Sequence, residues 1–82
     1  MTSHEDIRRM VKVVCITHGV RVIAMTGYQN FALQVDKTRK HTRGRDLALV
    51  VGALVTRYVG LGLERKVLED IAFAVFNVGA PA

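Results

Sequence analysis

The feature that most limits what this chain can fold into is a stretch from Asp46 to Gly60 that is apolar on nearly every side of a helix. Its longest apolar run, LALVVGALV at 47–55, has nine residues, whereas a membrane span needs about 20. The pattern predicts a central helix ending at about Val59, buried by its neighbours or by another subunit. Gly52 lowers the helix propensity, which either the close approach of another backbone or a tolerated flaw would explain. The apolar positions are Leu47, Leu49, Val50, Val51, Leu54, Val55, Tyr58 and Val59.

The size and composition of the chain indicate one domain, 1–82. At 82 residues it lies near the lower limit at which a hydrophobic core suffices without disulfides or metal. Half of the residues are hydrophobic and 23% are charged, which suits a folded domain better than a disordered one. The single cysteine excludes an internal disulfide, and the first residues, MTSHEDIRR, lack the apolar stretch of a secretory signal. We therefore expect a cytoplasmic protein without a membrane segment.

Two more helices are predicted near the ends of the chain. Ser3 and Asp6 have the spacing of a capping box, so a helix is expected to begin at about residue 4 and to end near Gly19. Its apolar stripe consists of Ile7, Met10, Val11 and Val14. A second amphipathic helix is predicted at about 63–76.

Between the first of these helices and the apolar stretch, the period of the pattern changes. NFALQVD at 30–36 places Phe31, Leu33 and Val35 on one face, which is the alternation of a half-buried strand. VRVIAM before it also resembles a strand, so 20–36 is predicted to be a β-hairpin. The expected fold is α+β, with the order helix–hairpin–helix–helix (αββαα) and the helices on one face of a small antiparallel sheet. Because two strands alone are marginal in water, we expect pairing between two copies, that is, a homodimer.

The sequence does not indicate catalysis or a cofactor. Cys15 and His18 could face each other on a helix, but no orienting carboxylate or set of oxyanion donors lies nearby in sequence. Adding His4 and His41 does not produce the two ligand pairs of a structural zinc site. No glycine-rich phosphate loop is present. We expect a non-enzymatic protein with no metal, no cofactor and no small-molecule substrate.

The strongest functional signal is the basic run KTRKHTRGR at 37–45, predicted to be a loop between the hairpin and the next helix. The net charge of +5 favours anionic partners, and a flexible basic loop can follow the phosphates of a nucleic acid. The predicted binding residues within the run are Lys37, Arg39, Lys40, His41, Arg43 and Arg45. Outside it they are Arg8, Arg9 and Lys12 on the first helix, Arg21 on the first strand and Tyr28 at the hairpin tip.

Two functions fit these features. The favoured one is a basic protein that binds DNA or RNA through phosphates with low sequence specificity. The alternative is a protein-interaction module, such as a small inhibitor or adaptor of the phage or mobile-element type, which docks on an acidic protein or a nucleoprotein complex of a host. The basic run could also serve solubility alone.

Overall fold

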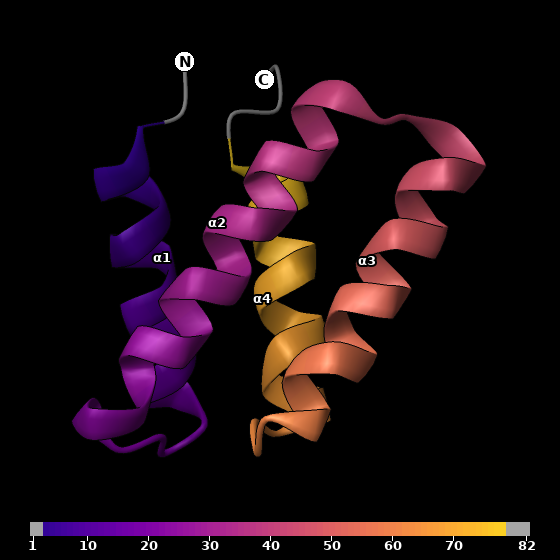
Figure 1. Ribbon diagram of the computed structural model, residues 1–82. Coiled ribbons are helices and arrows are strands. Elements are labelled where there is room, and N and C mark those ends of the chain that lie inside the picture. The colour runs from indigo at the N-terminus through magenta and orange to yellow at the C-terminus, as the bar shows by residue number, and fades with distance from the viewer. Residues whose placement is uncertain (1–2, 79–82) are drawn as a thin grey trace.

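The fold is entirely helical over residues 3–78, the part of the chain that the computed structural model describes. Four α-helices follow one another, with one short 3₁₀ helix, η1, after the first (Figure 1). Their bounds are α1 His4–Thr17, η1 Val22–Ala24, α2 Met25–His41, α3 Gly44–Gly60 and α4 Arg65–Asn77. The predicted α+β class, with its antiparallel sheet, is therefore wrong, because none of the described residues forms a strand.

The first and last helices lie where the sequence predicts them. The capping box of α1 is present, since Ser3 Oγ accepts a hydrogen bond from the Asp6 backbone and Asp6 in turn accepts one from the Ser3 backbone. Gly19, with φ of 71°, follows the end of α1 in the left-handed conformation that favours glycine. Helix α4 is amphipathic, as the sequence predicts, and buries Val67, Leu68 and Ile71.

The segment predicted as a β-hairpin is instead η1 followed by the long helix α2. The residues that α2 buries recur at helical spacing: Met25, Tyr28, Phe31, Ala32, Val35 and Asp36. The alternation of Phe31, Leu33 and Val35 led to the wrong prediction, because the strand period of 2 and the helix period of 3.6 both place residues 31 and 35 on one face. The good helix formers Lys37, Arg39 and Lys40 then extend the helix to His41.

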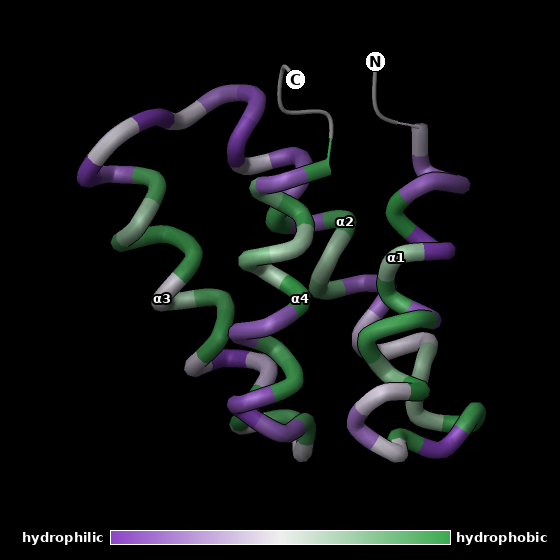
Figure 2. Tube along the Cα trace, turned by 180° about the vertical axis from the view of Figure 1, so that it is seen from behind, coloured by the Kyte–Doolittle hydropathy of each residue, from purple (hydrophilic) through white to green (hydrophobic). Residues whose placement is uncertain are grey.

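The helices form two central and two flanking elements. Helices α2 and α4 contact each other, and each of α1 and α3 contacts both of them, whereas α1 and α3 share no contact in the described chain. In Figure 1, α1 and α3 stand on opposite sides of α2 and α4, and in Figure 2 the same order is seen from behind. The core lies between α1, α2 and α4, with Ile7, Phe31, Leu68 and Ile71 fully buried.

Helix α3 is a flanking element and not the central helix that the sequence predicts, and its neighbours α2 and α4 cover one side of it. In this helix only Val51 and Val55 are less than a tenth exposed, while Leu49 remains 66% exposed. Figure 2 shows that the hydrophobic residues of α3 extend along most of its length, at the edge of the molecule. No helix of the described residues has the length and apolar character needed to cross a membrane.

The connection between α3 and α4 is fixed to α2 by two contacts. The Tyr28 hydroxyl accepts a hydrogen bond of 2.9 Å from the backbone N–H of Glu64, just before α4 begins. The side chain of Leu63 packs over Gly27, where a β-carbon would lie 3.4 Å from it, an ordinary van der Waals distance. These contacts hold the lower ends of α2, α3 and α4 in Figure 1 together.

Candidate functional site

The basic run at 37–45 is not a loop but the end of one helix and the start of the next. Residues 37–41 form the last turn of α2, Thr42 and Arg43 have extended backbones, and Gly44 with φ of 62° opens α3. Cations at the last turn of a helix are stabilised by the partial negative charge of its free carbonyl groups. The run is therefore held by the fold over most of its length.

Arg39 has a structural role within this run. Its Nε donates a hydrogen bond of 2.8 Å to Asp36 Oδ1, and Asp36 is only 2% exposed. Its Nη1 donates to the carbonyl groups of Val75 and, at 2.7 Å, of Val78, which lie at the C-terminal end of α4. Arg39 thus satisfies the last carbonyl groups of α4 and pairs a buried carboxylate. These partners make it a poor candidate for contact with a phosphate.

Lys40 shares the buried carboxylate but keeps access to solvent. Its Nζ lies 3.2 Å from Asp36 Oδ2, and half of its side-chain surface is exposed. With Arg39 on one oxygen and Lys40 on the other, Asp36 has a cation for each carboxylate oxygen, as a buried charge requires. An ammonium group has three donors, so Lys40 can contact a phosphate while it stays paired.

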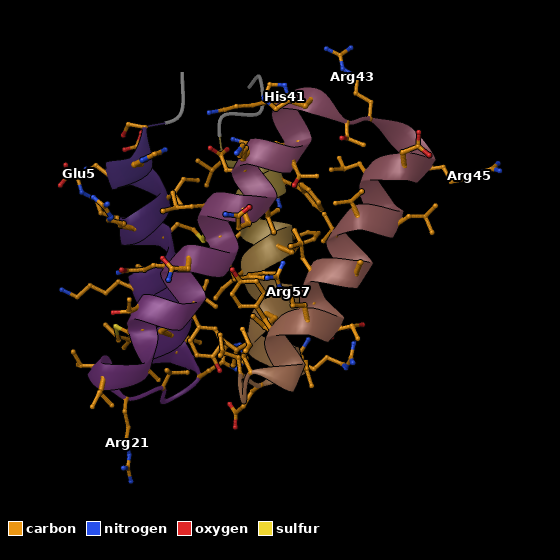
Figure 3. All side chains as sticks on the ribbon, viewed as in Figure 1. Glu5, Arg21, His41, Arg43, Arg45 and Arg57 are labelled. Carbon is orange, nitrogen blue, oxygen red and sulfur yellow. The ribbon has the colours of Figure 1, made fainter. Side chains whose placement is uncertain are left out.

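The remaining cations of the run point into solvent. Lys37, His41, Arg43 and Arg45 are all exposed. Figure 3 shows His41, Arg43 and Arg45 at the end of the molecule where α2 passes into α3, with both arginine side chains directed outward. Within residues 3–78, Lys37, Arg43 and Arg45 have no ion-pair partner.

A depression between α1 and α2 extends this basic end toward the start of the chain. It has a volume of about 290 Å³ and brings His4, at the beginning of α1, beside the last turns of α2. Its lining residues are His4, Leu33, Gln34, Asp36, Lys37 and Lys40. No sequence pattern groups His4 with this run, because only the antiparallel packing of α1 on α2 brings them together. We call the exposed cations Lys37, Lys40, Arg43 and Arg45, with His4 and His41, the basic end.

The other residues predicted to bind nucleic acid are only partly brought to the basic end. Arg8 and Lys12 lie one and two turns after His4 on α1 and are exposed. Arg9 is exposed too, and lies 3.9 Å from both Glu5 and Asp6.

Two of the predicted residues lie elsewhere. Arg21 lies at the end of the molecule opposite the basic end, and its side chain is directed outward (Figure 3). Tyr28 is 3% exposed and belongs to the core, so it presents no ring face to a base. The prediction of Tyr28 at a hairpin tip is wrong because that hairpin is a helix.

The residues considered for chemistry have separate partners. Cys15 is fully buried, and burial raises the pKa of its thiol, which disfavours the reactive thiolate. His18 Nε2 lies 2.7 Å from Asp70 Oδ2, on α4, where Lys66 Nζ also contacts the carboxylate at 3.1 Å. Within the described residues, no three histidine, cysteine or acidic side chains gather into a group that could hold a metal ion.

Comparison with known proteins does not add a relative to this description. No protein-family model, no curated protein sequence and no solved structure matches this chain. What the chain does must therefore be inferred from its own residues.

Proposed function

We propose that this chain is a small non-enzymatic protein that binds nucleic acid through phosphate contacts made by the basic end. The observation that carries the proposal is that Lys37, Arg43 and Arg45 are exposed cations without an acidic partner among residues 3–78, at one end of a chain with a net charge of +5. Unpaired cations contribute most to phosphate binding, because each one that meets a phosphate releases a condensed counterion. A cytosolic setting suits this function.

The helices determine how rigid the basic end is and which of its cations are available to a ligand. Helical backbone fixes Lys37 and Lys40, and a connection of two residues separates α2 from α3, so the basic end is a preformed surface. Arg39 is committed to Asp36 and to α4, which leaves three unpaired cations and the partly engaged Lys40 for the ligand. Because phosphate contacts carry no direct sequence information and no phenylalanine, tyrosine or tryptophan belongs to the basic end, specificity should be low.

The test compares two variants that lose the same charge. Lys37→Ser with Arg43→Ser removes two cations of the basic end, and Arg21→Ser with Arg65→Ser removes two exposed cations from other parts of the molecule. Affinity for a labelled duplex is measured at several salt concentrations. We expect the first variant to lose most of its binding. The plot of its log affinity against log salt should be less steep than that of the wild type by about 1.8, while the control should keep the slope of the wild type. Equal behaviour of the two variants would contradict a localised site.

A second candidate function, docking on another protein, is favoured by apolar side chains at the opposite end. Val22 and Ile23 are 79% and 89% exposed, in the connection from α1 to α2, and Ile16 in the last turn of α1 is 60% exposed. Exposed apolar residues that gather in one place are typical of interaction sites. Val22→Ser with Ile23→Ser should then abolish capture of a partner that the Lys37→Ser, Arg43→Ser variant still captures at moderate salt.

A further inference from the structure

A large apolar surface on α3 and α4 is left uncovered by residues 3–78. Leu49, Val50, Phe73 and Phe76 are 66%, 40%, 70% and 38% exposed. Phenylalanine side chains in particular lose much favourable burial when they stay in water. Because α3 meets only α2 and α4, the side of α3 turned away from these helices has no neighbour in the described chain.

A groove of about 370 Å³ runs between the two helices and includes both phenylalanines, while Leu49 lies on the outer side of α3 beside it. Its walls on α3 are small or β-branched, and its walls on α4 include both phenylalanines. The lining residues are Ala48, Val51, Gly52, Val55, Glu69, Ala72, Phe73 and Phe76. A β-carbon on Gly52 would meet nothing within 4 Å, so no contact among residues 3–78 requires a glycine there. We call the groove, together with Leu49, Val50 and the side of α3 that bears Asp46 and Arg57, the α3–α4 face.

The charges on α3 show which partner suits this face. Asp46 and Arg57 lie eleven positions apart, three turns along the same side of the helix, and both are exposed. Neither has an ion-pair partner within residues 3–78. A helix with an acid at one end and a base at the other is complementary to a copy of itself that runs in the opposite direction.

The centre of that arrangement falls on the smallest residues of the helix. Along the axis of α3, the midpoint of Asp46 and Arg57 is next to Gly52; around the helix, Gly52 and Ala48 lie on the groove side, and Ala53 lies between Gly52 and the side that bears the two charges. Two helices that cross at small residues can approach each other closely, to an axial distance of about 8 Å. The backbone of a second helix at this point would account for the glycine, which no contact among residues 3–78 requires.

We propose that the α3–α4 face is the interface between two copies of this chain, with their α3 helices antiparallel across a two-fold axis near Gly52. On one side of this axis Asp46 of each copy meets Arg57 of the other. On the opposite side Leu49 of each copy enters the groove of the other and packs on Phe73. Such an isologous contact places the same surface on both subunits, as most soluble homodimers do.

The length of α3 suits a dimer contact. A stable interface buries about 800 Å² per partner, roughly one seventh of the 5590 Å² that this chain exposes. A helix of 17 residues is about 25 Å long, and α3 offers one entire side over that length, with the flank of α4 beside it. The high apolar content of the face is typical of homodimer interfaces.

Most of the basic end lies outside this interface. Lys37 and Lys40 lie on α2, and Arg43 precedes α3, so only Arg45 adjoins the α3–α4 face. An antiparallel pair of α3 helices places the two basic ends at opposite ends of the dimer. The proposal therefore stands or falls independently of nucleic-acid binding.

The first experiment measures the mass of the full chain by sedimentation equilibrium from about 1 to 100 μM. We expect a monomer–dimer equilibrium that Leu49→Asp shifts strongly toward the monomer. Leu49 is exposed, so this substitution leaves the fold intact, which the helical circular dichroism signal verifies. Val13→Asp on the outer side of α1, equally exposed at 64%, is the matched control and should leave the dimer unchanged.

The second experiment tests the antiparallel pairing by charge reversal. Asp46→Arg alone and Arg57→Asp alone each create two like-charge contacts in a homodimer, so each should weaken self-association about tenfold. A 1:1 mixture of the two variants should recover it, because one copy then presents two arginines to the two aspartates of the other. A protein with both substitutions in one chain should also recover the dimer.

Three results would overturn the proposal. A wild-type chain that stays monomeric at the highest concentration excludes a second copy as the occupant of the groove. A dimer that is indifferent to Leu49→Asp uses another face. Failure of the mixture to associate better than either variant alone excludes the antiparallel contact between Asp46 and Arg57.

Discussion

The guanidinium group of Arg39 links two helices through a buried carboxylate: its Nε lies 2.8 Å from Asp36 Oδ1 on α2, and its Nη1 donates to the Val78 carbonyl at the end of α4. Asp36 is 2% exposed, and the Arg39 side chain is 17% exposed. Both side chains of the salt bridge are therefore largely buried, and the other partners of Arg39 are backbone carbonyl groups. This contact stabilises the packing of α2 on α4 at the basic end.

Replacing Arg39 by alanine should destabilise the fold markedly. The change leaves Asp36 with Lys40 as its one charged partner and frees the last carbonyl groups of α4, so we expect a loss of about 2–3 kcal/mol in the free energy of unfolding. Urea denaturation monitored by circular dichroism measures it. Lys37→Ala, two positions away on the exposed side, should change the free energy by less than about 0.5 kcal/mol. Equal small effects of both substitutions would remove the structural role of Arg39.

The hydrogen bond from the Glu64 backbone to the Tyr28 hydroxyl should be needed to hold the start of α4. Tyr28→Phe deletes the acceptor and leaves a partly buried N–H unpaired, for an expected loss of about 1–2 kcal/mol. Tyr58→Phe is the matched control, because the Tyr58 ring packs edge-on against Phe31 at 5.3 Å, while its hydroxyl has no hydrogen bond in the described chain. A thermal melt of both variants should show a clear shift for Tyr28→Phe alone.

Asp70 should make stability depend on pH in the acid range. Hydrogen bonds from Lys66 and from His18 lower the pKa of its carboxyl below the ordinary value of 3.8. A lowered folded-state pKa stabilises the fold above the unfolded pKa, and this contribution is lost as the pH falls through the folded value. The melting temperature of Asp70→Asn should therefore lie below that of the wild type near neutral pH. The difference should shrink below pH 3.8, and a difference that does not change with pH would contradict this role.

Gly52→Ala should separate the stability of one chain from that of the dimer. Inside an exposed stretch of helix, alanine is favoured over glycine by about 1 kcal/mol, and the new methyl group meets no atom of the same chain. We therefore expect a higher melting temperature in dilute solution together with weaker self-association. Sedimentation at high concentration and melting at low concentration measure the two effects. Unchanged association would place the dimer contact away from Gly52.

The sequence alone predicts the parts of this fold that have local signals. The capping box at Ser3 and Asp6 marks the start of α1, and the apolar stripes of α1 and α4 repeat at helical spacing over several turns. Residues 20–36 have weaker signals: β-branched residues precede a short alternation, and Gly27 and Asn30 resemble turn residues. The packing of Tyr28, Phe31 and Val35 against α4 and α1 decides for the helix, and tertiary contacts of this kind override local propensity.

The candidate site was predicted in part for the same reason. Composition identifies the basic run, and Lys37, Arg43 and Arg45 are indeed exposed. The sequence cannot show that Arg39 reaches Val75 and Val78, because residues 36 and 39 positions away meet only in the folded chain. His4 joins the run through the packing of α1 on α2, and Tyr28 leaves it because its ring belongs to the core. The exposure of α3 likewise depends on the arrangement of all four helices.

The most direct test of nucleic-acid binding is the affinity of the wild-type chain for a labelled duplex between about 50 and 200 mM salt. If Lys37, Arg43 and Arg45 each meet a phosphate, log affinity should fall against log salt with a slope of about −2.7 per chain, a loss of about 40-fold over this range. No binding at the lowest salt concentration, or an affinity that does not change with salt, would contradict the proposed function.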